Sequence, residues 1–264
     1  MTVVHRLSRA LAGAAFVALL AGCVAGAERI GEVRIDEAVQ HRVAAGMEYL
    51  QMDKPEEARQ HFSRALELDP RSAPANNAMA LLYRYEGDSV REEQHYKRAL
   101  RIDSDYAVAR NNYGILLYQR GDYRGAVREF ERVANDPRYS GRGRAFENLG
   151  RSYQALGDNA QAEKAFQRAL RLTRNPERSL LALTQLTQER GDLSLAKRYY
   201  DQYAANQQAP SAAGLLVGIR LAERRGADAE RQTLTQRLEQ DYPDSAELRA
   251  LRSGRSSAAP GSSS

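Results

Sequence analysis

A glycine turn that recurs at a nearly constant interval limits what this chain can fold into more than any other feature. Gly87, Gly121, Gly157, Gly191 and Gly226 follow one another at spacings of 34, 36, 34 and 35 residues, and an aspartate follows each of the first four. Such self-similarity is typical of arrays in which neighbouring units cover each other's apolar faces. With only 7% aromatic residues and no tryptophan, a linear array of helical pairs fits better than one large core.

The interval of about 34 residues is that of the tetratricopeptide (TPR) repeat, a helical hairpin. One interval before Gly87, Asp53 takes the turn position. The expected fold is therefore all-α, a superhelical solenoid of about six TPR helical hairpins over residues 39–251. The hairpins are expected to begin near residues 39, 73, 107, 143, 177 and 212.

Small residues are expected where the two helices of a hairpin cross, and larger apolar residues where hairpins stack. The second repeat departs from this pattern, with Glu92 at the crossing and Tyr96 in place of phenylalanine. At each turn, we expect glycine to adopt a left-handed conformation and aspartate to cap the next helix. The pattern is met by Gly46, Tyr49, Ala58, Phe62, Ala65 and Pro70 in the first repeat, by Gly114, Ala126 and Phe130 in the third, and by Gly150, Tyr153, Ala162, Phe166 and Ala169 in the fourth.

Residues 1–22 have the features of an export signal. Arg6 and Arg9 precede an apolar run over residues 10–21, which is too short to span a bilayer, and the string Leu-Ala-Gly ends directly before Cys23. This string resembles the bacterial lipobox, so we expect lipid attachment at Cys23, against the alternative of an ordinary secretory leader. Val24 in place of aspartate favours the outer membrane of a Gram-negative bacterium, with the protein on its periplasmic face.

Two flanking segments complete the expected domain organisation. Residues 23–38 are expected to be a lipidated N-terminus and tether, and residues 252–264 a disordered tail rich in serine, alanine and glycine. Residues 135–143 carry an insertion of two residues, which is expected to lengthen a loop between the third and fourth repeats.

The net charge of +5 does not indicate a nucleic-acid partner. Loss of Arg6 and Arg9 with the leader leaves 37 basic and 34 acidic residues, and these alternate along helices. His41, His61 and His95 have no further ligands at metal-binding spacing, and no serine or cysteine has a plausible base. We therefore expect no enzyme activity, no metal or other cofactor and no small-molecule substrate.

A partner protein is expected to lie along the first helices of the hairpins, whose side chains line the concave face of such arrays. Asn76, Asn77, Asn111 and Asn112 recur at equivalent places, and their amides are expected either to bind a partner's backbone or to bridge neighbouring helices. The expected groove residues are Met47, Asn77, Leu81, Arg84, Asn111, Ile115, Tyr118, Glu147 and Arg151.

Several strings along the chain are more specific than the repeat pattern. They are Asn111-Asn112-Tyr113-Gly114, Leu117-Tyr118, Gly121-Asp122-Tyr123, Glu147-Asn148-Leu149-Gly150, Gly218-Ile219-Arg220 and Tyr242-Pro243-Asp244-Ser245. In these strings the chain resembles the type IV pilus biogenesis and stability lipoproteins (PilF/PilW family). The resemblance implies a lipid-anchored pilotin, which binds the type IV pilus secretin and promotes its outer-membrane localisation and multimerisation. The alternative is a general TPR envelope adaptor that scaffolds peptidoglycan or outer-membrane assembly factors.

Overall fold

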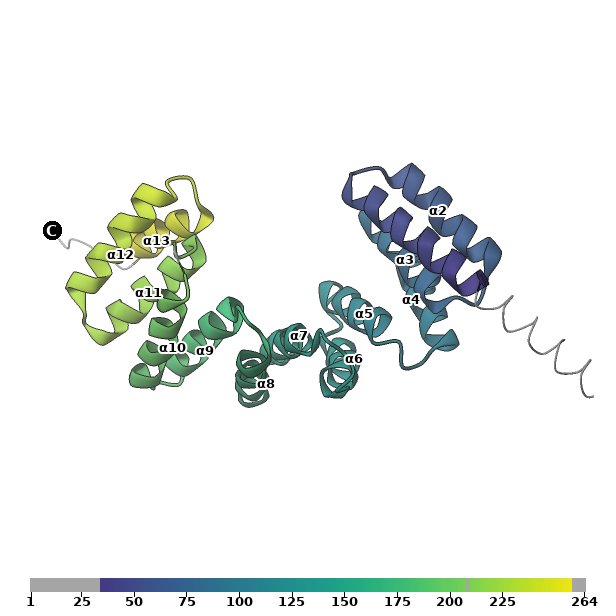
Figure 1. Ribbon diagram of the computed structural model, residues 1–264. Coiled ribbons are helices and arrows are strands. Elements are labelled where there is room, and N and C mark those ends of the chain that lie inside the picture. Colours follow the sequence, from purple (N-terminus) through teal and green to yellow (C-terminus); the bar gives the residue numbers. More distant parts are fainter. Residues whose placement is uncertain (1–33, 208, 258–264) are drawn as a thin grey trace, which may run out of the picture. The chain divides into compact units, whose positions relative to one another are not determined.

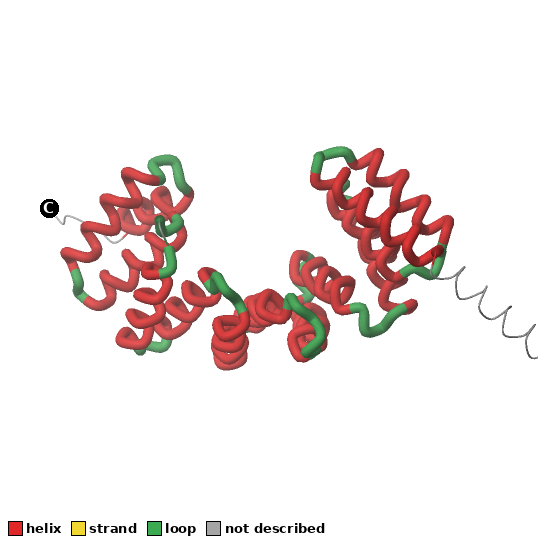
Figure 2. The backbone as a smooth tube through the Cα atoms, in the orientation of Figure 1, coloured by secondary structure: helices red, strands yellow, loops and turns green. Residues whose placement is uncertain are grey.

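The computed structural model describes residues 34–207 and 209–257, and all regular secondary structure within them is helical (Figures 1 and 2). The predicted all-α TPR fold is confirmed, and the first helices of the later hairpins begin within one residue of their predicted positions. The helices are a first helix over residues 34–51, α2 (Pro55–Leu68), α3 (Ala73–Tyr85), α4 (Ser89–Ile102), α5 (Ala107–Gln119), α6 (Tyr123–Asn135), α7 (Arg142–Ala155), α8 (Asn159–Leu172), α9 (Glu177–Glu189), α10 (Leu193–Ala205), α11 (Ala212–Arg225), α12 (Asp228–Asp241) and α13 (Ala246–Ser257).

The described chain forms two compact units, with the boundary between Leu116 and Leu117 in α5. In the first unit, α2 packs on α3, and α3 packs on α4. In the second unit, the successive helices from α6 through α12 pack on one another, and α13 packs on α11. The first helices α9 and α11 of two successive hairpins also touch, as the stacking of repeats requires.

The turns within the hairpins have the predicted chemistry. Gly87, Gly157 and the other repeated turn glycines have positive φ angles, and Asp53 takes the same conformation at φ 62°. Asp88 and Asp158 accept hydrogen bonds from the backbone N–H groups three residues ahead, at 2.9 and 3.1 Å. At the starts of α4, α6, α8 and α10, the aspartate therefore satisfies a donor that the helix itself leaves unpaired.

Close helix crossings explain why small and aromatic residues recur at the same positions in several hairpins. A Cβ atom added at Gly150 would lie 2.7 Å from the ring of Phe166, and one added at Gly46 would meet the ring of Phe62 in the same way. Both phenylalanine rings are buried. Glycine at the crossing thus allows the ring of the second helix to pack directly on the backbone of the first.

The boundaries of the expected solenoid need two corrections. Residues 34–38, expected to belong to a tether, lie in the first helix, because this stretch contains no glycine or proline to interrupt a helix. Residues 252–257, expected to be disordered, continue α13, where the Ser253 hydroxyl donates to the carbonyl of Ala250 at 3.0 Å. Residues 1–33, with the signal and Cys23, and residues 258–264 lie outside the described residues.

The insertion between the third and fourth repeats lengthens a loop, as predicted. Residues 136–141 connect α6 to α7, whereas four residues connect α4 to α5 and α8 to α9. Within the loop, the Arg138 backbone N–H donates to the Asp136 carboxylate at 3.0 Å, and the Arg142 guanidinium donates to the carbonyl of Ala134 at 3.0 Å. The extra residues are therefore accommodated in a hydrogen-bonded turn without breaking either helix.

Candidate functional site

The first unit contains six of the predicted groove residues, and several of them contribute to packing. Met47 packs against a buried cluster that includes Phe62 and Met79, and Leu81 packs against buried Tyr96. Asn111 and Ile115 are partly buried on α5. Their side chains therefore offer only part of their surface to a partner.

Asn77 bridges neighbouring helices. It is buried, and its side-chain oxygen accepts a hydrogen bond from the Asn112 amide at 3.0 Å, which links α3 to α5. The sequence left open whether these asparagines bind a partner or bridge neighbouring helices, and Asn77 forms such a bridge. Because the same oxygen is already occupied, partner recognition through Asn77 would compete with a contact between repeats.

Arg84 also makes its contacts within the first unit. Its guanidinium donates to the Glu92 carboxylate at 2.7 Å and to the carbonyl of Asn112 at 3.0 Å, and it lies over the ring of Tyr96. The Glu92 side chain is only 3% exposed, so its charge needs this partner. Glu92 thus takes the place of the small residue expected at the helix crossing, and Arg84 neutralises its charge.

The second unit places the three remaining predicted residues on one face. The Arg151 guanidinium lies 4.8 Å from the ring centre of Tyr118, a cation–π contact. Glu147 and Arg151, one helical turn apart on α7, both line a cavity of about 540 Å³. This size is within the range that binds a small ligand or a short stretch of peptide.

The cavity continues along the inner helices of the next two repeats. Its remaining lining comes mainly from α9 and α11, together with Phe166 of α8 and Glu247 of α13. Leu181, Gln185, Leu216 and Arg220 occupy the same repeat positions as Glu147 and Arg151, one or two units further on. The repeat register predicts these four positions as inner-helix positions, but the expected groove residues extended only to Arg151. We call the set Glu147, Arg151, Phe166, Arg178, Leu181, Ala182, Gln185, Ala213, Leu216, Val217, Arg220 and Glu247 the α7–α9–α11 groove.

Glu147 of the α7–α9–α11 groove is held in place by a neighbouring helix. It is buried, and its carboxylate accepts a hydrogen bond from the Ser179 hydroxyl at 3.1 Å. Ser211 donates to Glu177 at 3.1 Å between the next pair of inner helices. Such charge-assisted bonds hold successive inner helices at a defined spacing and preorganise the surface between them.

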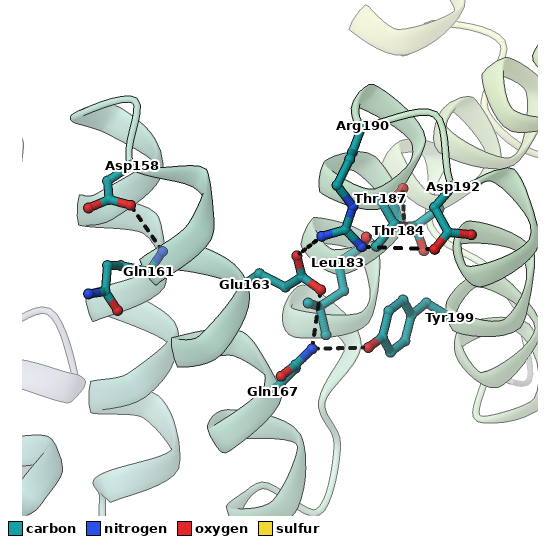
Figure 3. Close-up of polar contacts among 10 residues, drawn as sticks. All are labelled: Asp158, Gln161, Glu163, Gln167, Leu183, Thr184, Thr187, Arg190, Asp192 and Tyr199. Atoms are coloured by element: carbon teal, nitrogen blue, oxygen red, sulfur yellow. Dashed lines mark hydrogen bonds and ion pairs between the residues drawn. The ribbon is translucent and has the colours of Figure 1, made fainter.

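A separate polar network joins the fourth and fifth repeats (Figure 3). Glu163 of α8 pairs with Arg190 at 2.6 Å and accepts from Gln167 at 3.2 Å, while Gln167 also reaches the Tyr199 hydroxyl at 3.5 Å. Each side chain has a partner within the unit, which is the arrangement expected of a structural contact between repeats.

His61 and His95 take part in aromatic packing. His61 stacks on Tyr49 with ring centres 5.2 Å apart, and His95 lies 5.3 Å from Tyr83 at the equivalent place of the next repeat. Among residues 34–207 and 209–257, no group of three or more histidine, cysteine, aspartate or glutamate side chains could hold a metal ion. Within the same ranges, no helix has the length and apolar character needed to cross a bilayer.

The repeated hairpins define a tetratricopeptide-repeat protein, and residues 43–107 and 143–176 match family models described as tetratricopeptide repeats. Over 188 residues, the chain is 34% identical to the type IV pilus assembly protein PilF of Pseudomonas aeruginosa, covering 71% of this chain and 74% of that protein. The chain belongs to the family of this PilF protein.

Two solved structures agree with this assignment. A structure from the functional characterisation of Pseudomonas aeruginosa PilF has a TM-score of 0.75 at 33% identity, covering 83% of this chain and 99% of that one. The fold is also that of PilW, a widely conserved type IV pilus biogenesis factor, with a TM-score of 0.73 at 24% identity over 81% of this chain and 97% of that one.

Proposed function

We propose that this protein is an outer-membrane lipoprotein that acts in type IV pilus biogenesis as a pilotin. It binds the pilus secretin as a protein partner, brings it to the outer membrane and promotes its multimerisation. The observation that carries the proposal is the 34% identity to a type IV pilus assembly protein along most of both chains. The TPR fold supports a role in protein binding, because its inner helices form extended surfaces for partner segments.

Anchoring through Cys23 is part of the proposed mechanism. The Leu-Ala-Gly string before Cys23 supports acylation, and two or three acyl chains hold a protein on a membrane where a single chain gives only marginal binding. A secretin subunit bound to the repeats is thereby concentrated at the membrane in which it assembles. This role requires binding energy but no chemical step, so we propose no catalytic function.

The test is to delete the gene and to follow the heat-resistant multimers of the secretin in separated membranes by immunoblotting. Strains complemented with the wild-type gene or with Cys23→Ala provide the comparison, and total secretin monomer is measured in each. We expect the multimers to be lost on deletion and to return to the outer membrane only with the acylatable protein. Unchanged multimers in the deletion strain would contradict the pilotin role and would favour a general envelope adaptor.

A further inference from the structure

We infer that the α7–α9–α11 groove binds an extended peptide segment in which carboxylate side chains alternate with apolar ones. The inference deepens the proposed function. It rests on that proposal only in assigning the peptide segment to the pilus secretin. It concerns the second unit alone and depends on the charges and the apolar surface of its inner helices.

Three arginines give the groove its charge. Arg178 and Arg220 lie on the successive inner helices α9 and α11, are exposed, and make no hydrogen bond or ion pair with another described residue. Arg151 is also exposed, and its guanidinium lies 4.8 Å from the ring centre of Tyr118. Guanidinium groups bind carboxylates in a two-pronged geometry that amides and hydroxyls cannot reproduce.

The acidic residues of the groove do not cancel this charge. Glu147 is buried and accepts a hydrogen bond from Ser179, so its carboxylate is directed into the contact between α7 and α9. Glu247 belongs to α13 and is the second acidic residue that lines the groove. The three arginines therefore exceed the two glutamates, and an acidic ligand is electrostatically favoured over a basic one.

The floor of the groove is apolar. Leu216 and Val217 of α11 are 9% and 5% exposed, and Leu181 and Ala182 of α9 are partly exposed beside them. Successive side chains of an extended peptide point to opposite sides, so one set can lie on this floor while the other reaches the arginines. A free acidic metabolite would leave the apolar floor uncovered, which is why we assign a peptide.

The experiment measures binding of synthetic peptides to the mature protein by fluorescence anisotropy. The probes are fluorescein-labelled peptides of about ten residues that alternate leucine or valine with aspartate, asparagine or lysine, a length of about 33 Å when extended. We expect the aspartate peptides to bind at least about tenfold more tightly than the asparagine peptides, and to weaken as salt is raised.

The matched variants reverse charge inside and outside the groove. Arg178→Glu combined with Arg220→Glu is expected to weaken the aspartate peptides at least about tenfold and to strengthen the lysine peptides. Arg198→Glu, on the exposed face of α10, reverses the charge of another arginine without a described ion pair and is expected to leave all affinities unchanged. Circular dichroism of each variant checks that the helices are retained.

The results separate this inference from the proposed function. Equal binding of aspartate and asparagine peptides, or equal loss with Arg198→Glu, would overturn the inference while leaving the secretin experiment unaffected. If the charge reversal changes peptide preference as expected but the deletion strain keeps its secretin multimers, the groove assignment stands and the pilotin proposal fails. If folding is lost in the double variant, Arg178→Gln and Arg220→Gln singly provide the same comparison, and unchanged affinity in both would overturn the inference.

Discussion

The Glu92 carboxylate shows how one residue can depart from a repeat pattern without breaking the repeat. It lies where other repeats have Ala58, Ala126 or Ala162, and all three of those alanines are fully buried. The buried carboxylate is tolerated because Arg84 pairs with it from the facing helix at 2.7 Å. A charge at this position is stable only as part of the pair, since an uncompensated buried charge is costly.

We expect Glu92→Ala alone to lower the free energy of unfolding by about 2 kcal/mol, because Arg84 loses its charged partner while remaining partly buried. Adding Arg84→Met should recover part of this loss, which chemical denaturation of the single and double variants measures as a coupling energy. The exposed pair Arg64 and Glu67 is the control, and its substitution should change stability by less than about 0.5 kcal/mol. Purely additive effects at residues 84 and 92 would contradict the pairing.

His95 is expected to give the first unit a dependence on pH. Burial, with a smaller contribution from the charge of Arg98, lowers the pKa of His95 below its ordinary value. The folded state therefore binds this proton less readily than the unfolded state, so stability falls as pH drops below the ordinary histidine pKa of about 6.5, and levels off once the pH is below the folded-state pKa. Denaturation midpoints between neutral and mildly acidic pH, compared with those of His95→Gln, measure the effect. A variant with the same pH profile as wild type would contradict it.

Among the elements, the start of α12 lacks the side-chain cap that the starts of α4, α6, α8 and α10 have. Ala227 has φ −90° and ψ 70°, close to φ −84° and ψ 72° at Asp158, but it provides no side-chain cap. Ala227→Asn should therefore add a hydrogen bond to the first turn and raise the unfolding free energy by about 1 kcal/mol. Asn is used because Asp228 and Glu230 already make this turn acidic. The mirror change Asp158→Ala should lower stability similarly, and both are measured by thermal unfolding.

At Gly150, where α7 crosses α8, helix propensity and close packing have opposite effects on the stability of an alanine variant. Alanine forms helices better than glycine by about 1 kcal/mol, yet we expect Gly150→Ala to lower the unfolding free energy by about 1 to 3 kcal/mol. The reason is that the new Cβ would lie 2.7 Å from the buried Phe166 ring. Gly254, whose added Cβ would meet no neighbour, is the control, and Gly254→Ala should be neutral or slightly stabilising. Denaturant titration compares the two variants.

The sequence allowed the hairpins, their turns and their starting positions to be predicted because each depends on local chemistry. Glycine at the left-handed turn and aspartate at the following cap act within a few residues of each other. The same register placed Glu147 and Arg151 on one cavity. It did not reveal the pairing of Arg84 with Glu92, and it left open whether Asn77 and Asn112 bridge helices or bind a partner, because both depend on side-chain direction across different helices. The end of α13 was also missed, since serine and arginine neither require nor prevent a helix.

At the scale of the whole molecule, α13 closes the C-terminal end of the second unit. Leu248 of α13 is 1% exposed and lies in a buried cluster with Leu215, Ile219 and Leu238. A terminal helix of this kind covers the apolar face that the last hairpin would otherwise expose to water. We infer that the stability of the sixth repeat depends on α13, although the sequence of this helix carries no repeat motif.

We expect Leu248→Ala to lower the unfolding free energy by about 2 to 4 kcal/mol, as for other leucines removed from a closed core. Because each repeat is stabilised mainly by its neighbours, the loss should be graded along the array. Hydrogen exchange should accelerate most in α11 and α12, less in α9, and not in α2 to α4 of the first unit. Leu172→Ala, at a leucine that is 48% exposed, is the control and should leave exchange nearly unchanged. Uniform acceleration across both units would instead mean that the chain unfolds as one cooperative body, in which a terminal helix stabilises distant repeats as much as its own neighbour.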